Sequence, residues 1–475
     1  SHDSERIGEV LRGAGHLEAA SVEDADLVLL NTCSIREKAE QKLRSEVGRI
    51  ALLKQKRPEL TIAVAGCVAQ QEGEGLLKRM PDVDLLLGPD NIPELPRLLA
   101  ELDAGAVPFA RASFDLDNPQ FLTALSVQSG AATAFVTTMK GCDERCSFCI
   151  VPYTRGPERY RPAQSVVAEI AALAAAGVRE VTLLGQTVNS YRDPDRSLAP
   201  APDADTKDED ESEFAALVRR IASEVPALAR LRYTSPHPRH LTPSLVRAHR
   251  EIGILARHVH LPVQSGSDRM LKRMIRRYTR ADYVARVARL RREVPGVTLS
   301  TDVIVGFPGE TDDDFELTLS LVEEVGFVGV FGFKYSPRPY TPALKLGDDV
   351  PEETKSRRLS RLFERSEAIL SSYLGSLEGT RQRVLIEGEA RRGLDGAGRP
   401  TFTGRTENNA IVHVDDPAAL GLVGEVVEVE IVRALRHSVV GKLDEAAAAR
   451  GAERARAAGA RPKPRRALPV VSEDA

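Results

Sequence analysis

From about residue 133 onward, short apolar segments alternate with longer amphipathic ones, and this alternation constrains the fold more than any other feature. Each apolar run has the length of a buried strand, and the segments between them have the period of a helix. Six such units predict an α/β fold in which parallel strands form a partial or full (β/α) barrel. The predicted strands are 134–138, 180–184, 231–234, 258–263, 298–305 and 329–333, and the predicted helices are 164–176, 213–223, 243–251, 281–293 and 311–325.

The first hundred residues repeat this alternation on a smaller scale. They predict a small parallel α/β domain over residues 1–103. Cys33 and Cys67 follow its first two strands, at the edge where open α/β sheets place their ligands. The alternative is that each cysteine is a small buried hydrophobe. The predicted strands are 27–30, 61–65 and 85–87, and the predicted helices are 35–56 and 92–102.

The remaining segments differ in composition. Residues 104–130 are irregular and predict a linker, and 131–376 form the barrel unit, which ends in a long helix over 351–376. Residues 193–213 are rich in Pro, Ala and acidic groups and predict a disordered surface insertion. In residues 378–443 the apolar side chains recur with a period of two, which predicts a small all-β barrel with strands at 383–386, 410–414 and 424–432. The low-complexity end of the chain predicts a disordered tail over 444–475.

Composition favours a cytoplasmic protein. Hydrophobic residues make up 42% and charged residues 28% of the 475, and the net charge is −4, so there is no global basic field. The apolar runs are too short to cross a bilayer, and the first residues lack the pattern of a secretory signal. A disulfide framework would be denser than five cysteines, three of which lie within eight residues.

Those three cysteines are Cys142, Cys146 and Cys149, in the pattern C-x3-C-x2-C after the first strand of the barrel. Closely spaced thiolates can hold a [4Fe–4S] cluster, and three ligands would leave one iron open for another molecule. The alternatives are a zinc site, although the usual paired motifs are absent, and a purely structural thiol group.

Polar residues follow several of the predicted strands. Gly185 and Gln186 could receive the amino group of a cofactor or form a turn. Asp302 lies inside a strand, where a carboxylate needs a partner. Gln264, Ser265 and Ser267 could line a cofactor or cap a helix, and His237 and His240 could be ligands or loop structure.

Arginines cluster in two places beside these loops and recur in the β module. Phosphate contact is a natural use for them, and a solvated helix face is the alternative. The candidates for RNA contact are Arg155, Arg159, Arg273, Arg276, Arg277 and Arg405, with Arg383 and His413 as further candidates in the β module.

Many motifs resemble the methylthiotransferase family of radical S-adenosylmethionine enzymes, and within it the branch that modifies dimethylallyladenosine in tRNA. The loop KGCDERCSFCIVPYTRGPERYRP carries much of the likeness, and the final β module resembles an RNA-binding TRAM domain. One departure is Tyr340, where the family usually has glycine. The matching segments are 31–42, 65–70, 88–95, 140–162, 183–191, 233–241, 260–280, 300–311 and 333–343.

The resemblance implies two [4Fe–4S] clusters and S-adenosylmethionine as cofactors. Cys142, Cys146 and Cys149 would hold the radical cluster, with Phe148 near the adenine of S-adenosylmethionine. Cys33 and Cys67 would hold an auxiliary cluster that supplies or holds sulfur. The family pattern has a third auxiliary cysteine just before the motif that reads SHDSER here, so the chain is expected to be truncated at its N-terminus.

The implied reaction adds a methylthio group to carbon 2 of N(6)-dimethylallyladenosine at position 37, next to the anticodon. The implied partners are a tRNA anticodon stem-loop and an electron donor such as flavodoxin or ferredoxin, with the chain acting as a monomer and no membrane involved. One alternative is a sister enzyme acting on threonylcarbamoyladenosine in tRNA or on an aspartate of a ribosomal protein. Another is a non-catalytic iron–sulfur protein that binds RNA.

Overall fold

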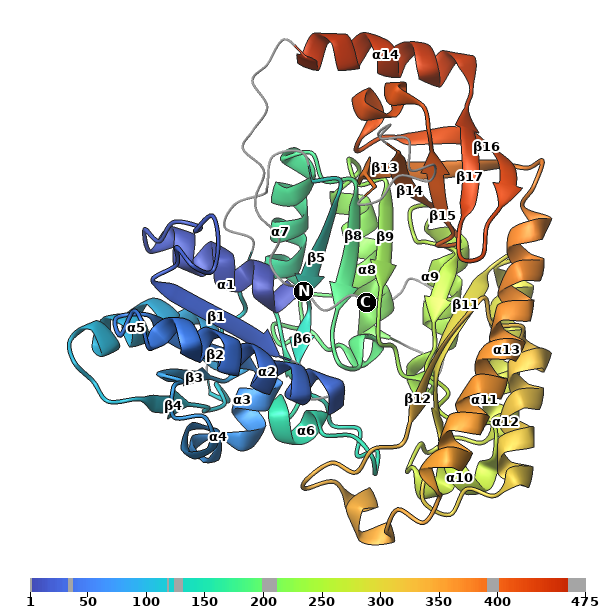
Figure 1. Cartoon of the computed structure of the whole chain (residues 1–475). Coiled ribbons are helices and arrows are strands. Elements are labelled where there is room, and N and C mark those ends of the chain that lie inside the picture. Colours follow the sequence, from blue (N-terminus) through green and yellow to red (C-terminus); the bar gives the residue numbers. More distant parts are fainter. Residues whose placement is uncertain are drawn as a thin grey trace.

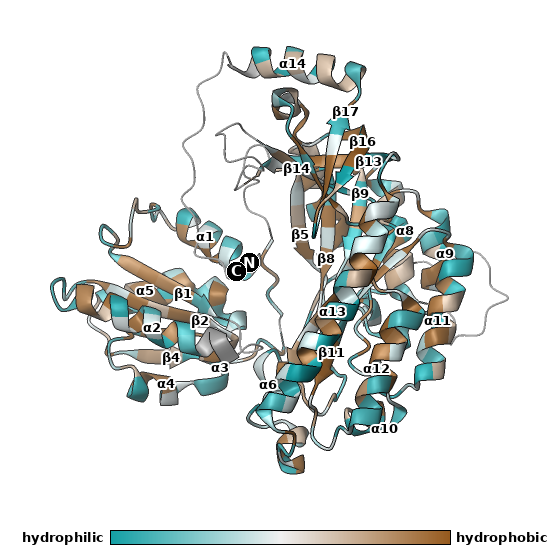
Figure 2. Cartoon of the chain, turned by 45° about the vertical axis from the view of Figure 1, so that its right-hand side comes forward, coloured by the Kyte–Doolittle hydropathy of each residue, from teal (hydrophilic) through white to brown (hydrophobic). Residues whose placement is uncertain are grey.

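The computed structural model describes residues 2–32, 37–117, 119–123, 131–198, 212–390 and 401–459. Three units follow one another along the chain (Figure 1): a small α/β domain, an open barrel of parallel strands and a closed β-barrel. Figure 2 shows that the strands are mainly hydrophobic, whereas hydrophilic residues dominate the outer faces of the helices. Among the described residues, no helix is both long and apolar enough to span a bilayer.

The N-terminal domain has a four-stranded parallel sheet in the order β1-β2-β3-β4. The three predicted strands are confirmed. The last strand falls within residues 104–130, so the linker prediction is wrong there: a three-residue strand completes the sheet. The elements are α1 (His2–Gly13), β1 (Leu27–Thr32), α2 (Glu37–Lys54), β2 (Thr61–Gly66), α3 (Cys67–Glu72), α4 (Glu74–Arg79), β3 (Leu85–Leu87), the 3-10 helix η1 (Pro89–Glu94), α5 (Leu95–Asp103) and β4 (Phe109–Arg111).

The central unit is a partial barrel. Its six parallel strands form two sheets, β5-β8-β9 and β10-β11-β12, linked by a bridge between Leu231 and Leu255. Within the described chain β5 and β12 do not pair, so the barrel stays open on one side. Its strands are β5 (Thr133–Thr137), β8 (Glu180–Leu184), β9 (Arg230–Tyr233), β10 (His258–His260), β11 (Thr298–Val305) and β12 (Gly329–Lys334).

Helices on the outside of the barrel bury their apolar faces against the strands in one continuous core. The predicted start of the helix after β11 is confirmed, because Thr311 and Asp314 form a capping box there. The helices are α7 (Ala163–Ala175), α8 (Glu213–Glu224), α9 (Pro243–Glu251), α10 (Asp268–Arg273), α11 (Arg280–Glu293) and α12 (Asp312–Val325), and a small hairpin of β6 (Met139–Lys140) and β7 (Arg159–Tyr160) encloses α6 (Val151–Thr154).

The long helix α13 (Glu352–Ser376) leads to a closed five-stranded barrel in the order β13-β14-β15-β17-β16. The sequence analysis missed β14 and β17. Phe402 lies in the core of this barrel. The strands are β13 (Arg381–Glu389), β14 (Phe402–Thr406), β15 (Ile411–Val414), β16 (Val426–Ala434) and β17 (Val439–Leu443), and the 3-10 helix η6 (Pro417–Leu422) lies between β15 and β16.

The prediction of disorder over 444–475 is wrong for its first half. Residues Glu445–Gly459 form α14, which packs on η6 with Ala447 fully buried. Small side chains allow this approach: a Cβ atom at Gly451 would lie 2.3 Å from the carbonyl oxygen of Ala418. Residues 460–475 lie outside the described chain, as do 199–211 of the predicted acidic insertion.

The closed barrel is docked on the amino ends of the parallel strands, at the opposite end from β6 and α6 (Figure 1). Arg230 and Arg232 begin β9 and donate to the carbonyl oxygens of Arg405 (2.9 Å) and Thr406 (2.8 Å). Glu180 pairs with both guanidinium groups, at 3.2 and 2.9 Å. The interface therefore uses main-chain acceptors of the closed barrel, and the charges of Arg230 and Arg232 are compensated by Glu180.

Candidate functional site

The three-cysteine loop leaves β6 at a tight turn. Gly141 has φ of 74°, and a Cβ atom there would lie 1.9 Å from the carbonyl oxygen of Pro157, so glycine is required. Further along, Ser147 donates from its backbone N–H to the carbonyl of Met274 (3.0 Å) and receives a bond from Ala343 N–H (2.8 Å). These bonds tie the loop to the connections after α10 and β12.

The three thiols lie on one loop and are wholly or partly shielded from solvent. Cys142 and Cys146 are buried and Cys149 is half-buried. Burial raises the pKa of Cys149 to about 12, and the nearby thiols of Cys146 and Cys142 add to the shift. Such thiols are poor nucleophiles at neutral pH, because the thiolate is the reactive form. Bound iron would supply the positive charge that the thiolates need, so the donor set fits an iron–sulfur cluster.

Cys142 has a hydrogen-bonding partner that the sequence analysis did not single out. The hydroxyl oxygen of Thr187 lies 2.9 Å from its sulfur. Burial raises the pKa of Cys142 to about 11, and the bond to Thr187 opposes that rise. Its position in the sequence could have indicated this role, because Thr187 directly follows Gly185 and Gln186.

Gly185 and Gln186 lie next to this pair, after β8. The side-chain oxygen of Gln186 is buried and has no hydrogen-bond partner among the described residues. A buried acceptor of this kind is costly unless a donor reaches it. It therefore fits the predicted role of receiving an ammonium group.

Ser265 and Ser267 were predicted to line a cofactor, but this prediction is wrong because both side chains are buried and bonded within the protein. Ser265 is fully buried, with its hydroxyl 3.3 Å from that of Thr318. Ser267 caps α10 and donates to Asp314 at 2.6 Å, so the helix-cap alternative is confirmed. Gln264 has φ of 74° and joins β11 through its backbone, with its N–H bonded to Asp302 O at 2.9 Å.

Asp302 has the partner that a strand carboxylate needs. His260 approaches it with Nε2 at 3.4 Å, and Nδ1 of the same ring lies 2.9 Å from the Ser300 hydroxyl. Phe148 is half-buried and packs against an apolar group that includes Met270, Met274 and Phe307.

The sequence analysis also missed Glu144, which lies between two of the cysteines. Its carboxylate is 3.1 Å from His240 Nε2, and this bond holds the pKa of Glu144 down to about 2. Glu144, His237 and His240 could hold a metal ion, since their ligand atoms lie within 4.8 Å of one another. However, Arg239 lies 3.9 Å from the carboxylate, and the pKa of His237 is lowered by burial and then by the charge of Arg276, so positive charge already surrounds the group. That charge disfavours a further cation.

Two of the predicted RNA-binding arginines are buried, so that role is wrong for them. Arg159 pairs with Asp90 at 2.5 Å and with Asp115. Arg276 is 5% exposed and donates to the sulfur of Cys146 at 3.2 Å. Neither guanidinium can reach a phosphate outside the fold.

Of the other four predicted RNA-binding arginines, three make contacts within the protein and one is exposed. Arg155 pairs with Asp3 at 2.6 Å, Arg273 donates to Pro308 O at 3.1 Å, and Arg405 pairs with Glu387 at 3.3 Å. These three contacts are within the protein and weaken the case for RNA contact. Arg277 is exposed and is still a candidate.

The predicted auxiliary cysteines cannot be compared as a pair, because Cys33 lies outside the described residues. Cys67 is buried at the start of α3, which packs on α6. Burial would lower the pKa of Arg155, but Asp3 and then Cys67 outweigh it and raise that pKa. Cys67 therefore lies at the boundary between the first domain and the barrel.

Asp314 supports the cofactor side of the barrel, and its replacement gives a testable prediction. Burial would raise its pKa, but bonds from Arg269, Ser267 and Thr311 lower it further than burial raises it. The lowered pKa stabilises the fold above the unfolded value of about 3.9, and this contribution is lost as the pH falls through the folded value.

Asp314→Asn is therefore expected to cost about 2 kcal/mol of unfolding free energy at pH 7. Urea unfolding should show a constant difference from the parent down to about pH 5 and a shrinking one below about pH 4. The exposed neighbour Asp313→Asn is the control, with an expected change within about 0.5 kcal/mol. A cost that does not change with pH would contradict the assignment to the ionised carboxylate.

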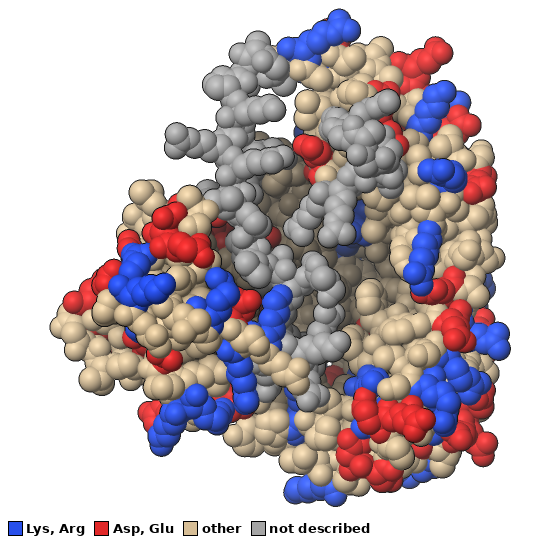
Figure 3. All heavy atoms as spheres, in the orientation of Figure 1, with Lys and Arg blue, Asp and Glu red and all other residues tan. Residues whose placement is uncertain are grey.

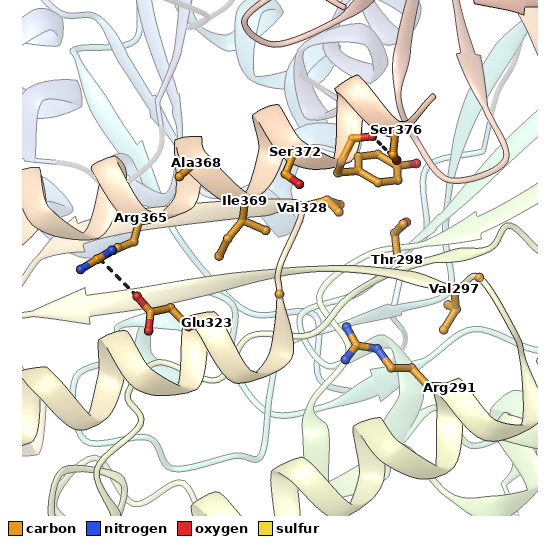
Figure 4. Close-up of a pocket in the computed structure, with 13 residues that line it drawn as sticks. Arg291, Val297, Thr298, Glu323, Val328, Arg365, Ala368, Ile369, Ser372 and Ser376 are labelled. Carbon is orange, nitrogen blue, oxygen red and sulfur yellow. Dashed lines mark hydrogen bonds and ion pairs between the residues drawn. The ribbon is translucent and has the colours of Figure 1, made fainter. Parts of the chain in front are cut away.

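A separate surface hollow of about 700 Å³ lies away from the cysteines, between α11, α12 and α13 (Figure 4). Its charged groups are already paired: Arg365 lies 3.2 Å from Glu323, and Arg291 donates to the carbonyl of Val325. It shares no residue with the candidate site.

Three family models match the chain. The model described as "Radical SAM superfamily" matches residues 136–322, "TRAM domain" matches 375–443, and "Uncharacterized protein family UPF0004" matches 1–88. Among solved structures, a cobalamin-dependent S-adenosylmethionine radical enzyme, OxsB, aligns with a TM-score of 0.50 at 14% identity, over 79% of this chain and 56% of that one. This likeness supports the fold alone.

Curated relatives extend over the whole chain. A Sorangium cellulosum protein is 64% identical, covering 100% of this chain and 97% of its own length. A Bordetella petrii protein is 45% identical, covering 92% and 88%. Both are named tRNA-2-methylthio-N(6)-dimethylallyladenosine synthase. With the three-cysteine loop at the carboxyl end of the first barrel strand, these relatives establish that the chain belongs to the methylthiotransferase family of radical S-adenosylmethionine enzymes.

Proposed function

We propose that this chain adds a methylthio group to carbon 2 of N(6)-dimethylallyladenosine at position 37 of tRNA, next to the anticodon. The observation that carries the proposal is the 64% identity, along the full chain, to a relative named for that reaction. The loop that carries Cys142, Cys146 and Cys149 supports it, because three cysteine ligands would leave one iron of a [4Fe–4S] cluster open.

In this proposal Cys142, Cys146 and Cys149 would hold a [4Fe–4S] cluster, and the chemistry that the cluster would supply with S-adenosylmethionine is the removal of a hydrogen atom from the base. The side-chain oxygen of Gln186 accepts from the amino group of the cofactor. Gln264, Asp302 and Phe148 lie along the same edge of the barrel and complete the cofactor side.

Cys33 and Cys67 are proposed ligands of a second [4Fe–4S] cluster. The position of Cys67 beside α6 supports this, because α6 follows the radical cluster loop directly. A sulfur source held there would face the barrel unit. This cluster would supply or hold the sulfur that becomes the methylthio group.

RNA contact would rely on local groups. Figure 3 shows Lys and Arg interspersed with Asp and Glu over one face, without a broad field of one sign. Arg277 is exposed on the connection whose backbone holds the cluster loop, so it could contact a phosphate of the anticodon loop. We further propose that the chain acts as a monomer in the cytoplasm, with a flavodoxin or ferredoxin as electron donor.

The test is nucleoside mass spectrometry of tRNA from cells that lack the gene, with and without the gene restored. We expect loss of the 2-methylthio form of N(6)-dimethylallyladenosine, accumulation of N(6)-dimethylallyladenosine without the methylthio group, and recovery of the 2-methylthio form on complementation. Loss of the 2-methylthio form of threonylcarbamoyladenosine instead would assign the chain to a sister reaction. Unchanged tRNA would overturn the proposal.

A further inference from the structure

Arg276 is a buried cation whose described partners include no carboxylate. Its guanidinium donates to Cys146 Sγ (3.2 Å), Pro262 O (2.8 Å) and the Tyr278 hydroxyl (3.0 Å). The same group lies 5.4 Å from the centre of the Tyr278 ring. Every one of these acceptors is neutral unless Cys146 is a thiolate.

A buried charge without a counter-charge destabilises a fold. The sulfur of Cys146 is the one contacting group that becomes anionic when it binds iron. Two nearby arginines have other partners: Arg239 pairs with the carboxylate of Glu144, and Arg273 donates to Pro308 O and not to a cysteine sulfur. Arg276 is therefore placed to compensate the charge of the cluster rather than that of another side chain.

Thr187 makes a second contact with the cluster ligands, from a different connection of the barrel. Its hydroxyl is 2.9 Å from Cys142 Sγ, and Thr187 is buried. A thiolate has no hydrogen to give, so the hydroxyl must be the donor when Cys142 holds iron. This hydrogen bond is neutral, whereas the one from Arg276 carries a charge.

We propose that Arg276 and Thr187 are positioning residues that raise the reduction potential of the cluster on Cys142, Cys146 and Cys149. Reduction moves one electron from an external donor onto the cluster and breaks no bond in the protein. The added negative charge is stabilised by donors to the coordinating sulfurs, and more strongly by a cation than by a hydroxyl. Removing either donor therefore makes the cluster harder to reduce.

This inference rests on the cluster assignment in the proposed function and is independent of the RNA substrate. The measurement is a redox titration followed by EPR, with dithionite as reductant, on the reconstituted full chain without S-adenosylmethionine or tRNA. A Cys67→Ala background restricts the titration to the radical cluster. The variants are Arg276→Gln, Arg276→Lys and Thr187→Val, with the exposed Arg277→Gln as the matched control.

Arg276→Gln is expected to lower the equilibrium constant for reduction at least tenfold, which is about 59 mV for one electron. Arg276→Lys keeps the charge and is expected to recover most of that loss. Thr187→Val is expected to shift the potential in the same direction by less, and Arg277→Gln is expected to leave it unchanged.

The proposal would be overturned if Arg276→Gln and Thr187→Val both bind about four irons and both keep the reduction potential of the parent. If Arg276→Gln binds no cluster, Thr187→Val decides the matter: a lower potential supports the proposal and an unchanged one rejects it. A chain that titrates as expected but leaves tRNA unmodified would contradict the proposed function alone.

Discussion

Replacement of Cys142, Cys146 and Cys149 together by alanine is expected to remove about four irons per chain and to abolish cleavage of S-adenosylmethionine. The three thiols lie on one short loop, and the other free thiol among the described residues, that of Cys67, belongs to the N-terminal domain and is not expected to replace them. The loss of activity should exceed about a thousandfold, because radical formation depends on the cluster rather than on the protein alone. Iron and sulfide analysis after anaerobic reconstitution measures the first effect, and product formation measures the second.

Cys67→Ala is the matched control for this experiment. It removes a buried thiol of the N-terminal domain and is expected to leave cleavage of S-adenosylmethionine intact while lowering the iron content. If the parent binds about eight irons and the triple variant about four, both clusters form in this chain. A triple variant that retains the parental iron content would refute the ligand assignment.

Glu169→Gln is expected to lower the free energy of unfolding by about 3–5 kcal/mol. Glu169 pairs with Arg161, which is 1% exposed, and lies 3.8 Å from Arg6 of α1. Removing the carboxylate charge leaves a buried guanidinium without its counter-charge. Because Arg6 also lies next to this carboxylate, the variant should loosen the contact between α1 and the barrel. Urea unfolding, followed by circular dichroism, measures the change.

The control is Glu224→Gln, the same replacement in an exposed pair on α8. Glu224 lies 2.7 Å from Arg220 within one helical turn, and its expected cost is at most about 0.5 kcal/mol. Equal costs at the two positions would contradict the role of burial in the Arg161–Glu169 pair.

Local patterns allowed much of this architecture to be predicted. The barrel strands contain short apolar segments that alternate with helical ones, and the three cysteines lie within eight residues, so both features can be recognised without tertiary information. Short strands were harder to find. β4 has three residues and β14 carries Gly404, which packs against the carbonyl of Leu385, so neither shows a clear period of two. Whether the barrel closes depends on the edges of β5 and β12, which no local pattern specifies.

The roles of the arginines could not be predicted, because the partners of a long side chain are set by the fold. Arg159 donates a hydrogen bond to Asp90, which lies 69 residues earlier, and Arg276 donates one to Cys146, which lies 130 residues earlier. A cluster of basic residues in the sequence therefore suggested an RNA surface where the fold buries two of its members. The alanine-rich segment after residue 444 was wrongly predicted to be disordered. Its small side chains allow α14 to pack closely on η6.

The most direct test of the central claim is the fate of S-adenosylmethionine with the reconstituted, dithionite-reduced chain under anaerobic conditions. We expect liquid chromatography and mass spectrometry to detect 5′-deoxyadenosine and methionine, and we expect neither to form without reductant or with the Cys142, Cys146 and Cys149 triple variant. Intact S-adenosylmethionine in the presence of a chain that holds its full iron complement would contradict the assignment of this loop as a radical-generating site.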